Sequence, residues 1–145
     1  MGLAKRNIEK EYLERNRKIN NVLLTAYEIE LIQNILNEND TVDRIYINFC
    51  NPWPKPRHNK KRLTHTKQLE KYKIFLKPEG EIYFKTDDEN LFNASIKYLK
   101  EAGFKIIAKT YNLKKEPIWD ENIQTEHEIM FEEQGISTKA LIAIY

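Results

Sequence analysis

The stretch Arg44-Ile45-Tyr46-Ile47-Asn48-Phe49-Cys50-Asn51-Pro52-Trp53-Pro54 contains a strand signal and, directly after it, the signal that ends a strand. Along residues 44–50, β-branched and aromatic side chains alternate with more polar ones, which is the period-two pattern of a β-strand. Pro52 and Pro54 end the strand, because proline has no backbone N–H to donate to a sheet. We therefore expect a strand over Arg44–Cys50 that leads into a stiff, extended loop.

Outward from this strand, strand and helix signals alternate along the chain. Further strands are expected at Asn21–Thr25, Glu81–Thr86, Lys105–Tyr111 and Ala140–Tyr145. Apolar residues at helical spacing predict helices over Ala4–Ile19, Ile29–Leu36, Leu69–Leu76, Phe92–Leu99 and Glu126–Glu133. A turn is expected at Pro78–Gly80, and Gly103 is expected just after the end of a helix. Such alternation is typical of an α/β fold, in which helices cover a mainly parallel sheet.

Length and composition indicate one ordinary globular domain over residues 1–145. Hydrophobic residues make up 41% of the chain and charged residues 32%, and no apolar run approaches the roughly 20 residues of a membrane span. We expect no membrane partner and no signal peptide. The single cysteine, Cys50, excludes an internal disulfide framework and favours a cytoplasmic location.

A net charge of only +2 conceals one strongly positive segment. Residues 55–67 contain no acidic side chain and six basic ones: Lys55, Arg57, Lys60, Lys61, Arg62 and Lys67. A basic cluster of this density can hold phosphates, and the aromatic plane of Trp53 beside it can stack on a base. The alternative is a proline-rich strand exit followed by a solvated basic helix start.

Three segments follow predicted strands and are expected to converge. In parallel sheets, ligands bind beyond the carboxyl ends of the strands. The segments 25–28, 51–55 and 86–88 occupy such positions. This convergence predicts an active site.

Three motifs, in order and at similar spacing, resemble the tRNA (guanine-N7-)-methyltransferases. They are Asn51-Pro52-Trp53-Pro54-Lys55-Pro56-Arg57-His58-Asn59-Lys60-Lys61-Arg62, Phe84-Lys85-Thr86-Asp87 and Thr125-Glu126-His127-Glu128. The resemblance covers essentially the whole chain. It implies the C-terminal part of a Rossmann-like class I methyltransferase sheet, covered by helices and lacking the first two strands. The complete sheet of that family has the strand order three-two-one-four-five-seven-six, with the seventh strand antiparallel.

The resemblance also implies an activity: methyl transfer from S-adenosylmethionine to guanine in the tRNA variable loop. Asn51 then takes the catalytic position, and Glu28 and Asn51 are the expected cofactor-binding residues. The expected substrate-binding residues are Lys55, Asp87, Thr125, Glu126, His127 and Glu128. The expected RNA-binding residues are Arg57, His58, Lys60, Lys61 and Arg62. No metal site is expected, because no Cys or carboxylate spacing supports one.

The chain departs from the family pattern in two ways. Asn51 stands where the family usually has Asp, so this position brings no negative charge. None of the four glycines forms a G-x-G turn, so by the resemblance the chain begins after the donor-binding loop. We therefore expect the isolated chain to bind S-adenosylmethionine weakly or not at all, and to be inactive alone. A non-catalytic RNA-binding fragment is the main alternative, and an amino-group methyltransferase rests only on Asn51-Pro52.

Three site residues also have structural interpretations that stay open. Glu28 is equally well explained as a first-turn helix acid. Asp87 could be an ordinary turn residue at a strand end. Thr125 could cap a helix with Glu128 as its capping-box partner, and this role is compatible with substrate contact.

Missing neighbours would leave the strand Arg44–Cys50 at the edge of the sheet. Its apolar side chains and the lack of a proline before Pro52 make such an edge prone to recruit another strand. Either Val22–Thr25 moves across to cover it, or two chains pair there as a homodimer. We favour the homodimer.

Overall fold

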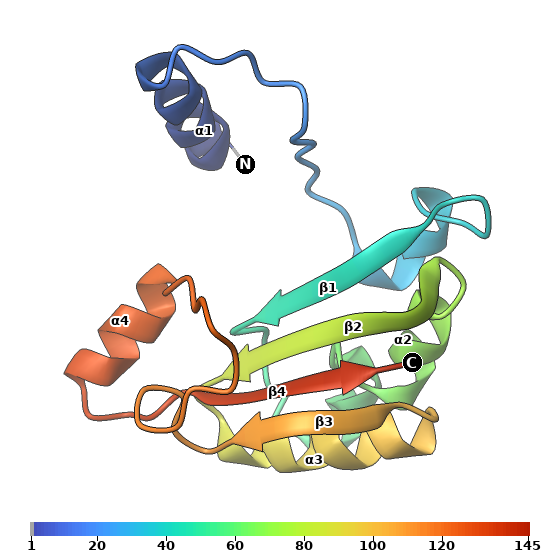
Figure 1. The fold of residues 1–145 in the computed structure, drawn as a ribbon. Coiled ribbons are helices and arrows are strands. Elements are labelled where there is room, and N and C mark those ends of the chain that lie inside the picture. The colour runs from blue at the N-terminus through green and yellow to red at the C-terminus, as the bar shows by residue number, and fades with distance from the viewer. Residues whose placement is uncertain (1) are drawn as a thin grey trace.

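The computed structural model describes residues 2–145 and places one sheet at the centre of the chain (Figure 1). In chain order the elements are α1 (Gly2–Glu14), the 3-10 helix η1 (Ile29–Asn34), β1 (Val42–Asn48), the 3-10 helix η2 (Pro56–Lys61), α2 (Thr66–Tyr72), β2 (Leu76–Thr86), α3 (Glu89–Glu101), β3 (Lys105–Thr110), α4 (Glu126–Glu133) and β4 (Lys139–Ile144). Residues 2–145 contain no helix that combines the length and the apolar character needed to span a membrane.

The four strands form a sheet in the order β1-β2-β4-β3. β1 and β2 are parallel, whereas β4 runs antiparallel to both β2 and β3. This order matches the four-five-seven-six part of the expected sheet, including its antiparallel seventh strand. The α/β fold class and the assignment to the later part of a Rossmann-like sheet are therefore confirmed.

The hydrophobic core lies between the sheet and the helices α2 and α3, which cover one of its faces (Figure 1). Leu69 of α2, Phe84 of β2, Phe92 and Leu99 of α3, and Leu141 of β4 are fully buried there. The ring centroids of Phe84 and Phe92 lie 6.3 Å apart in a stacked arrangement. Apolar residues at helical spacing in α3 thus meet the alternating apolar residues of the strands, as their patterns predict.

Two local signals fix the ends of α3. The Asp88 carboxylate accepts a hydrogen bond from the backbone N–H of Leu91 at 2.6 Å and so caps the helix N-terminus. At the other end Gly103 has φ +83°, the left-handed conformation that ends many helices. The expected position of Gly103 after the helix is confirmed.

The expected turn at Pro78–Gly80 lies inside β2 as an irregularity rather than between two elements. The pairing with β1 jumps from Val42↔Leu76 to Arg44↔Glu81, and Glu79 has φ +61°. A Cβ at Gly80 would lie 2.6 Å from Leu76 Cγ, so only glycine fits this bend. Leu76 accordingly begins β2, and its expected place at the end of the preceding helix was wrong.

The expected strand at Asn21–Thr25 is absent from the structure, which describes this segment as irregular. A strand is stable only when its backbone pairs, and no strand among residues 2–145 lies beside this segment. The following expected helix is the short 3-10 helix η1, with non-helical dihedrals at Leu31. β1 is an edge strand, as expected, but residues 22–25 do not pair with it.

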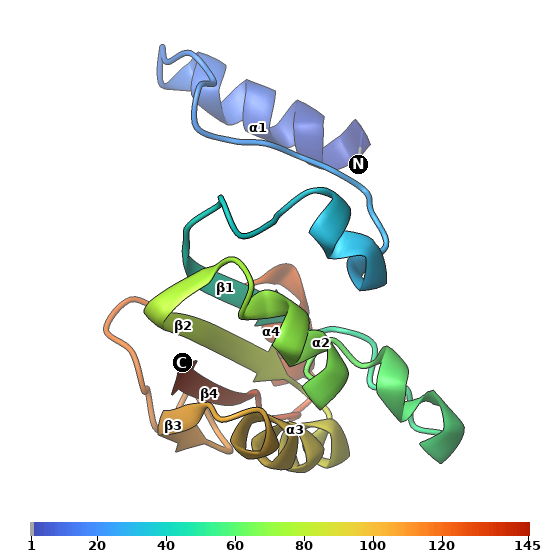
Figure 2. The ribbon, with the colours of Figure 1, turned by 90° about the vertical axis from the view of Figure 1, so that its right-hand side faces the viewer.

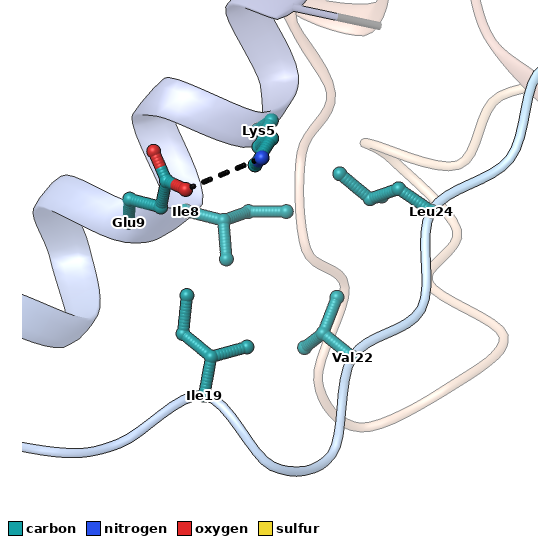
Figure 3. Close-up of a pocket in the computed structure, with 6 residues that line it drawn as sticks. All are labelled: Lys5, Ile8, Glu9, Ile19, Val22 and Leu24. Carbon is teal, nitrogen blue, oxygen red and sulfur yellow. Dashed lines mark ion pairs between the residues drawn. The ribbon is translucent and has the colours of Figure 1, made fainter.

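Residues 2–28 form an N-terminal arm that stands apart from the sheet in two perpendicular views (Figures 1 and 2). α1 contributes no buried residue. Ile8 of α1 lies with Ile19, Val22 and Leu24 of the following segment around a pocket beside the Lys5–Glu9 ion pair (Figure 3).

Candidate active site

The C-terminal ends of the parallel strands β1 and β2 lie at the same end of the sheet, and the beginning of α4 lies beside them (Figure 1). Asn51 follows β1 and Asp87 directly follows β2, and these strands are parallel neighbours. The ring of Phe49, next to β1, stacks on the ring of His127 in α4 with their centroids 6.0 Å apart. The structure therefore brings together three of the segments that carry predicted site residues.

Asn51 lies exposed in a loop whose backbone is sharply bent. Its side-chain oxygen accepts a hydrogen bond from the backbone N–H of Trp53 at 3.0 Å, and Trp53 has φ +44°. In the described part of the chain, the Asn51 amide nitrogen has no hydrogen-bond partner. The loop thus uses the carbonyl side of the amide for its own turn and leaves the N–H2 group for a ligand.

Arg62 holds this loop from behind. Its guanidinium donates hydrogen bonds to the backbone carbonyls of Pro52 at 2.8 Å and Trp53 at 3.2 Å, and to the Tyr98 hydroxyl at 3.4 Å. Only 7% of Arg62 is exposed. Because all three contacts are internal, Arg62 supports the Pro-Trp-Pro corner, and its expected contact with RNA stays a prediction.

Other basic residues of the segment lie on the surface, and two of the segment's side chains, Lys61 and His58, contact the Trp53 ring. Lys55, Arg57, Lys60 and Lys61 are exposed around the 3-10 helix η2. The Lys61 ammonium lies 5.0 Å from the centroid of the Trp53 ring, and the His58 ring meets Trp53 edge-on at 5.6 Å. An aromatic plane flanked by exposed positive charges suits a base together with its phosphates.

Asp87 and Asp88 are adjacent but differ in their contacts. The Asp88 carboxylate caps α3, whereas within residues 2–145 the Asp87 carboxylate has no hydrogen-bond or ion-pair partner. The backbone carbonyl of Asp87 accepts a hydrogen bond at 2.9 Å from the ammonium of Lys139, a buried residue of β4. Lys139 thus fixes the backbone of this corner, and the Asp87 side chain remains available.

Among residues 125–128, two side chains make internal polar contacts and the other two are exposed. The Thr125 hydroxyl accepts a hydrogen bond from the Glu128 backbone N–H at 3.2 Å, which confirms the expected N-cap of α4. Glu126 and His127 are exposed. The Glu128 carboxylate is only 1% exposed and forms an ion pair of 2.7 Å with Lys85, so it does not close a capping box.

Glu28 is not joined to the other site residues. It is exposed and precedes η1, and its side chain makes no capping hydrogen bond. Because no strand forms at Asn21–Thr25, the expected reason for Glu28 to lie at a strand end is missing. Within the described part of the chain, no hydrogen bond or ion pair links Glu28 to Asn51, Asp87 or α4.

Sequence reasoning missed two buried cations behind the site, Lys85 and Lys139. A lysine inside an apolar strand that ends at predicted site residues is the signal that could have identified Lys85. Nothing local marks its partner Asn122, because the two residues meet only through the fold.

Burial raises the pKa of the Cys50 thiol, next to Asn51, to about 11, so Cys50 is not a nucleophile at neutral pH. In residues 2–145 no three His, Cys, Asp or Glu side chains gather as metal ligands would.

Residues 4–141 match the model of a family described as putative methyltransferase. A tRNA (guanine-N(7)-)-methyltransferase of Clostridium beijerinckii is 63% identical over 99% of this chain and 65% of its own length. Proteins of the same name from Clostridium botulinum and Ruminiclostridium cellulolyticum are 61% and 58% identical. The chain thus spans a little under two thirds of the length of these relatives.

Among solved structures, a SAM-dependent methyltransferase from Archaeoglobus fulgidus is 15% identical to this chain. The match covers 84% of this chain and 66% of that one, with a TM-score of 0.45.

Proposed function

The chain belongs to this methyltransferase family, and we propose that it forms the guanine- and RNA-binding part of a tRNA (guanine-N(7)-)-methyltransferase. The observation that carries the proposal is the meeting of Asn51, Asp87 and the first turn of α4 at one sheet edge, beside the exposed basic helix η2. The 63% identity to a relative of that name supports the same conclusion.

The chemistry at guanine N7 needs orientation rather than a base. N7 carries a lone pair and no proton, so the nitrogen is already nucleophilic, and positive charge develops on the ring as the new bond forms. The Asp87 carboxylate, which has no partner within residues 2–145, can accept hydrogen bonds from the donor groups of guanine, as carboxylates do from amino groups. Glu126 and His127 lie exposed in the first turn of α4, and Thr125 caps the helix that carries them.

The described residues provide one side of a donor site. S-adenosylmethionine, when bound, supplies an electrophilic methyl group. The exposed amide of Asn51 has its N–H2 group available beside the proposed base position, which fits a role in orienting the donor or the base. We keep Glu28 in the proposal only as a donor contact that requires the arm to approach the sheet.

The proposed RNA contacts are Lys55, Arg57, His58, Lys60 and Lys61. The four lysine and arginine side chains are exposed and His58 is half-buried, and all five residues lie close in sequence to the proposed base site. Arg62 supports the Pro-Trp-Pro corner, and Lys55 directly follows this corner in the sequence. The proposed base site and the proposed phosphate contacts therefore belong to one loop. A tRNA substrate also implies a cytoplasmic location.

The unpaired edge of β1 further suggests a homodimer. Along β1, one side of the backbone pairs with β2 and the other pairs with no strand among residues 2–145. Such edges join other strands when nothing covers them.

Methylation of tRNA by the whole protein tests the proposed function. We expect 7-methylguanosine in digested tRNA, detected by mass spectrometry. Asn51→Asp should keep or raise the rate because Asp adds charge complementary to the developing cation, and Asn51→Ala should lower it. Equal rates for the wild type and Asn51→Ala would remove Asn51 from the mechanism. RNA binding without methylation would favour the non-catalytic alternative.

A further inference from the structure

A closed polar ring lies beneath α4. The Lys85 ammonium donates to Glu128 Oε2 at 2.7 Å, to Asn122 Oδ1 at 2.5 Å and to the carbonyl of Ile123 at 3.0 Å. The Asn122 amide in turn donates to Glu128 Oε1 at 2.6 Å. All three N–H bonds of the ammonium and both carboxylate oxygens therefore have partners.

Aromatic side chains close one side of this ring. The indole of Trp119 donates to Asn122 Oδ1 at 3.2 Å, and the Lys85 ammonium lies 5.6 Å from the centroid of the Trp119 ring. Trp119 stacks on Tyr83 of β2 with ring centroids 5.0 Å apart. The segment between β3 and α4 is thus attached to β2 by polar and aromatic contacts at neighbouring positions.

The ring is better suited to fixing geometry than to adding stability. Lys85 and Glu128 have side chains that are 5% and 1% exposed, and removing two charges from water offsets most of their attraction. An apolar pair of similar volume would hold α4 equally well against the sheet. A charged pair with an amide bridge adds direction, because each hydrogen bond must be aligned.

The position of the ring indicates what it orients. Glu128 lies in the first turn of α4, one residue after His127, whose ring stacks on Phe49 next to the Asn51 loop. Lys85 lies two residues before Asp87 on β2. One ammonium thus connects two of the three segments that form the candidate site.

We propose that Lys85 is a positioning residue, which acts with Asn122 to set the first turn of α4 against the ends of β1 and β2. Its part in methyl transfer rests on the proposed function. Lys85 touches neither base nor donor; it acts through Glu128. A displacement of about 1 Å in such a turn can lower a rate by about a hundredfold.

Two variants and a matched control test this role. Lys85→Met keeps an unbranched apolar chain of the length of the lysine stem and removes the ammonium, and Lys85→Arg retains a positive charge. Lys114→Met is the control, because the exposed Lys114 side chain also joins the β3–α4 segment to α4, through an ion pair of 3.0 Å with Glu132. The first readout is the nuclear Overhauser contact between the Phe49 and His127 rings in this chain, with the Phe84–Phe92 contact as the measure of an intact core.

We expect Lys85→Met to lose the Phe49–His127 contact and to keep the Phe84–Phe92 contact. In the whole protein, kcat for guanine methylation should fall at least about tenfold, while the affinity for tRNA changes less than about twofold because η2 is untouched. Lys85→Arg should recover part of kcat, and Lys114→Met should match the wild type in every readout.

A Phe49–His127 contact that persists in Lys85→Met would overturn the positioning role, and so would an equal effect of Lys114→Met. If Lys85→Met unfolds the core, Asn122→Ala takes its place, since it opens the ring and leaves the ion pair. Asn122→Ala must then lose the Phe49–His127 contact with its core intact, or the inference is wrong. Failure of the wild type to methylate tRNA would contradict the proposed function, whereas the Phe49–His127 contact would still decide what Lys85 positions.

Discussion

Apolar side chains recur in both the N-terminal arm and the sheet, but in residues 2–145 they are buried only in the sheet and the helices packed on it. In the arm, Leu3 and Leu13 of α1 are 66% and 80% exposed, although α1 forms a regular helix. In the sheet, Phe84 and Leu141 are fully buried between α2, α3 and the strands. The difference shows that periodicity specifies which face of an element is apolar, whereas burial needs a partner to receive that face.

Core and arm should therefore respond very differently to the removal of an apolar side chain. Phe84→Ala should lower the free energy of unfolding by about 3–5 kcal/mol, because it empties a packed core. Leu13→Ala should change it by less than about 0.5 kcal/mol. Urea denaturation monitored by circular dichroism measures both. A comparable effect of Leu13→Ala would mean that the arm packs on the sheet in solution.

The lysines of η2 and those of the arm should also contribute differently to tRNA binding. Replacing Lys60 and Lys61 with Ala should flatten the slope of log affinity for tRNA against log salt by about one for each phosphate that is no longer neutralised. The matched control replaces Lys5 and Lys10 of the arm, which form i,i+4 ion pairs on exposed α1. Binding titrations at several salt concentrations supply the slopes. If both double variants flatten the slope equally, η2 is not a specific RNA surface.

Self-association should depend on the edge of the sheet and not on the arm. Sedimentation at low micromolar concentration is expected to show a species of twice the 17.4 kDa chain mass. Tyr46→Lys places a charge on the exposed edge strand β1 and should shift the chain toward the monomer. Deleting residues 2–20 should leave the dimer intact. A wild-type monomer would remove the edge-to-edge dimer.

The smallest expected effect is a pH dependence within the sheet region. The His65 ring accepts a hydrogen bond from the backbone N–H of Lys67 at 3.1 Å and caps α2, and burial together with the Lys60 charge lowers the pKa of His65. The stability that this cap contributes is therefore fully present above the unfolded pKa of about 6.5 and is lost as pH falls through the lower pKa of the folded state. Denaturation between about pH 7 and pH 5 should show a decrease of stability that His65→Asn reduces, since Asn caps without titrating.

Sequence reasoning succeeded where a signal and its partner are both local. The strands around Ile47 and Phe84, the cap at Thr125 and the glycine after α3 are all in place. It failed where the outcome depends on a distant partner. Asn21–Thr25 has strand composition but no strand among residues 2–145 to pair with.

The candidate site shows the same limit. The loops after β1 and β2 could be predicted, because parallel strands end at one edge. The burial of Arg62 could not, because it depends on two carbonyls of the preceding loop and on Tyr98 of α3. In the polar ring, Lys85 meets Asn122 and Glu128, which lie 37 and 43 residues further along the chain, and no local pattern marks these pairs.

We propose that the loops after β1 and β2 and the first turn of α4 form one guanine site, away from the arm. Titration of guanosine monophosphate into the isotopically labelled chain, followed by amide chemical shifts, tests it most directly. We expect shifts at residues 51–55, 86–88 and 125–128 that weaken in Asp87→Asn, with none at residues 2–20. Shifts confined to the arm, or spread evenly over the chain, would contradict a single site at the ends of these strands.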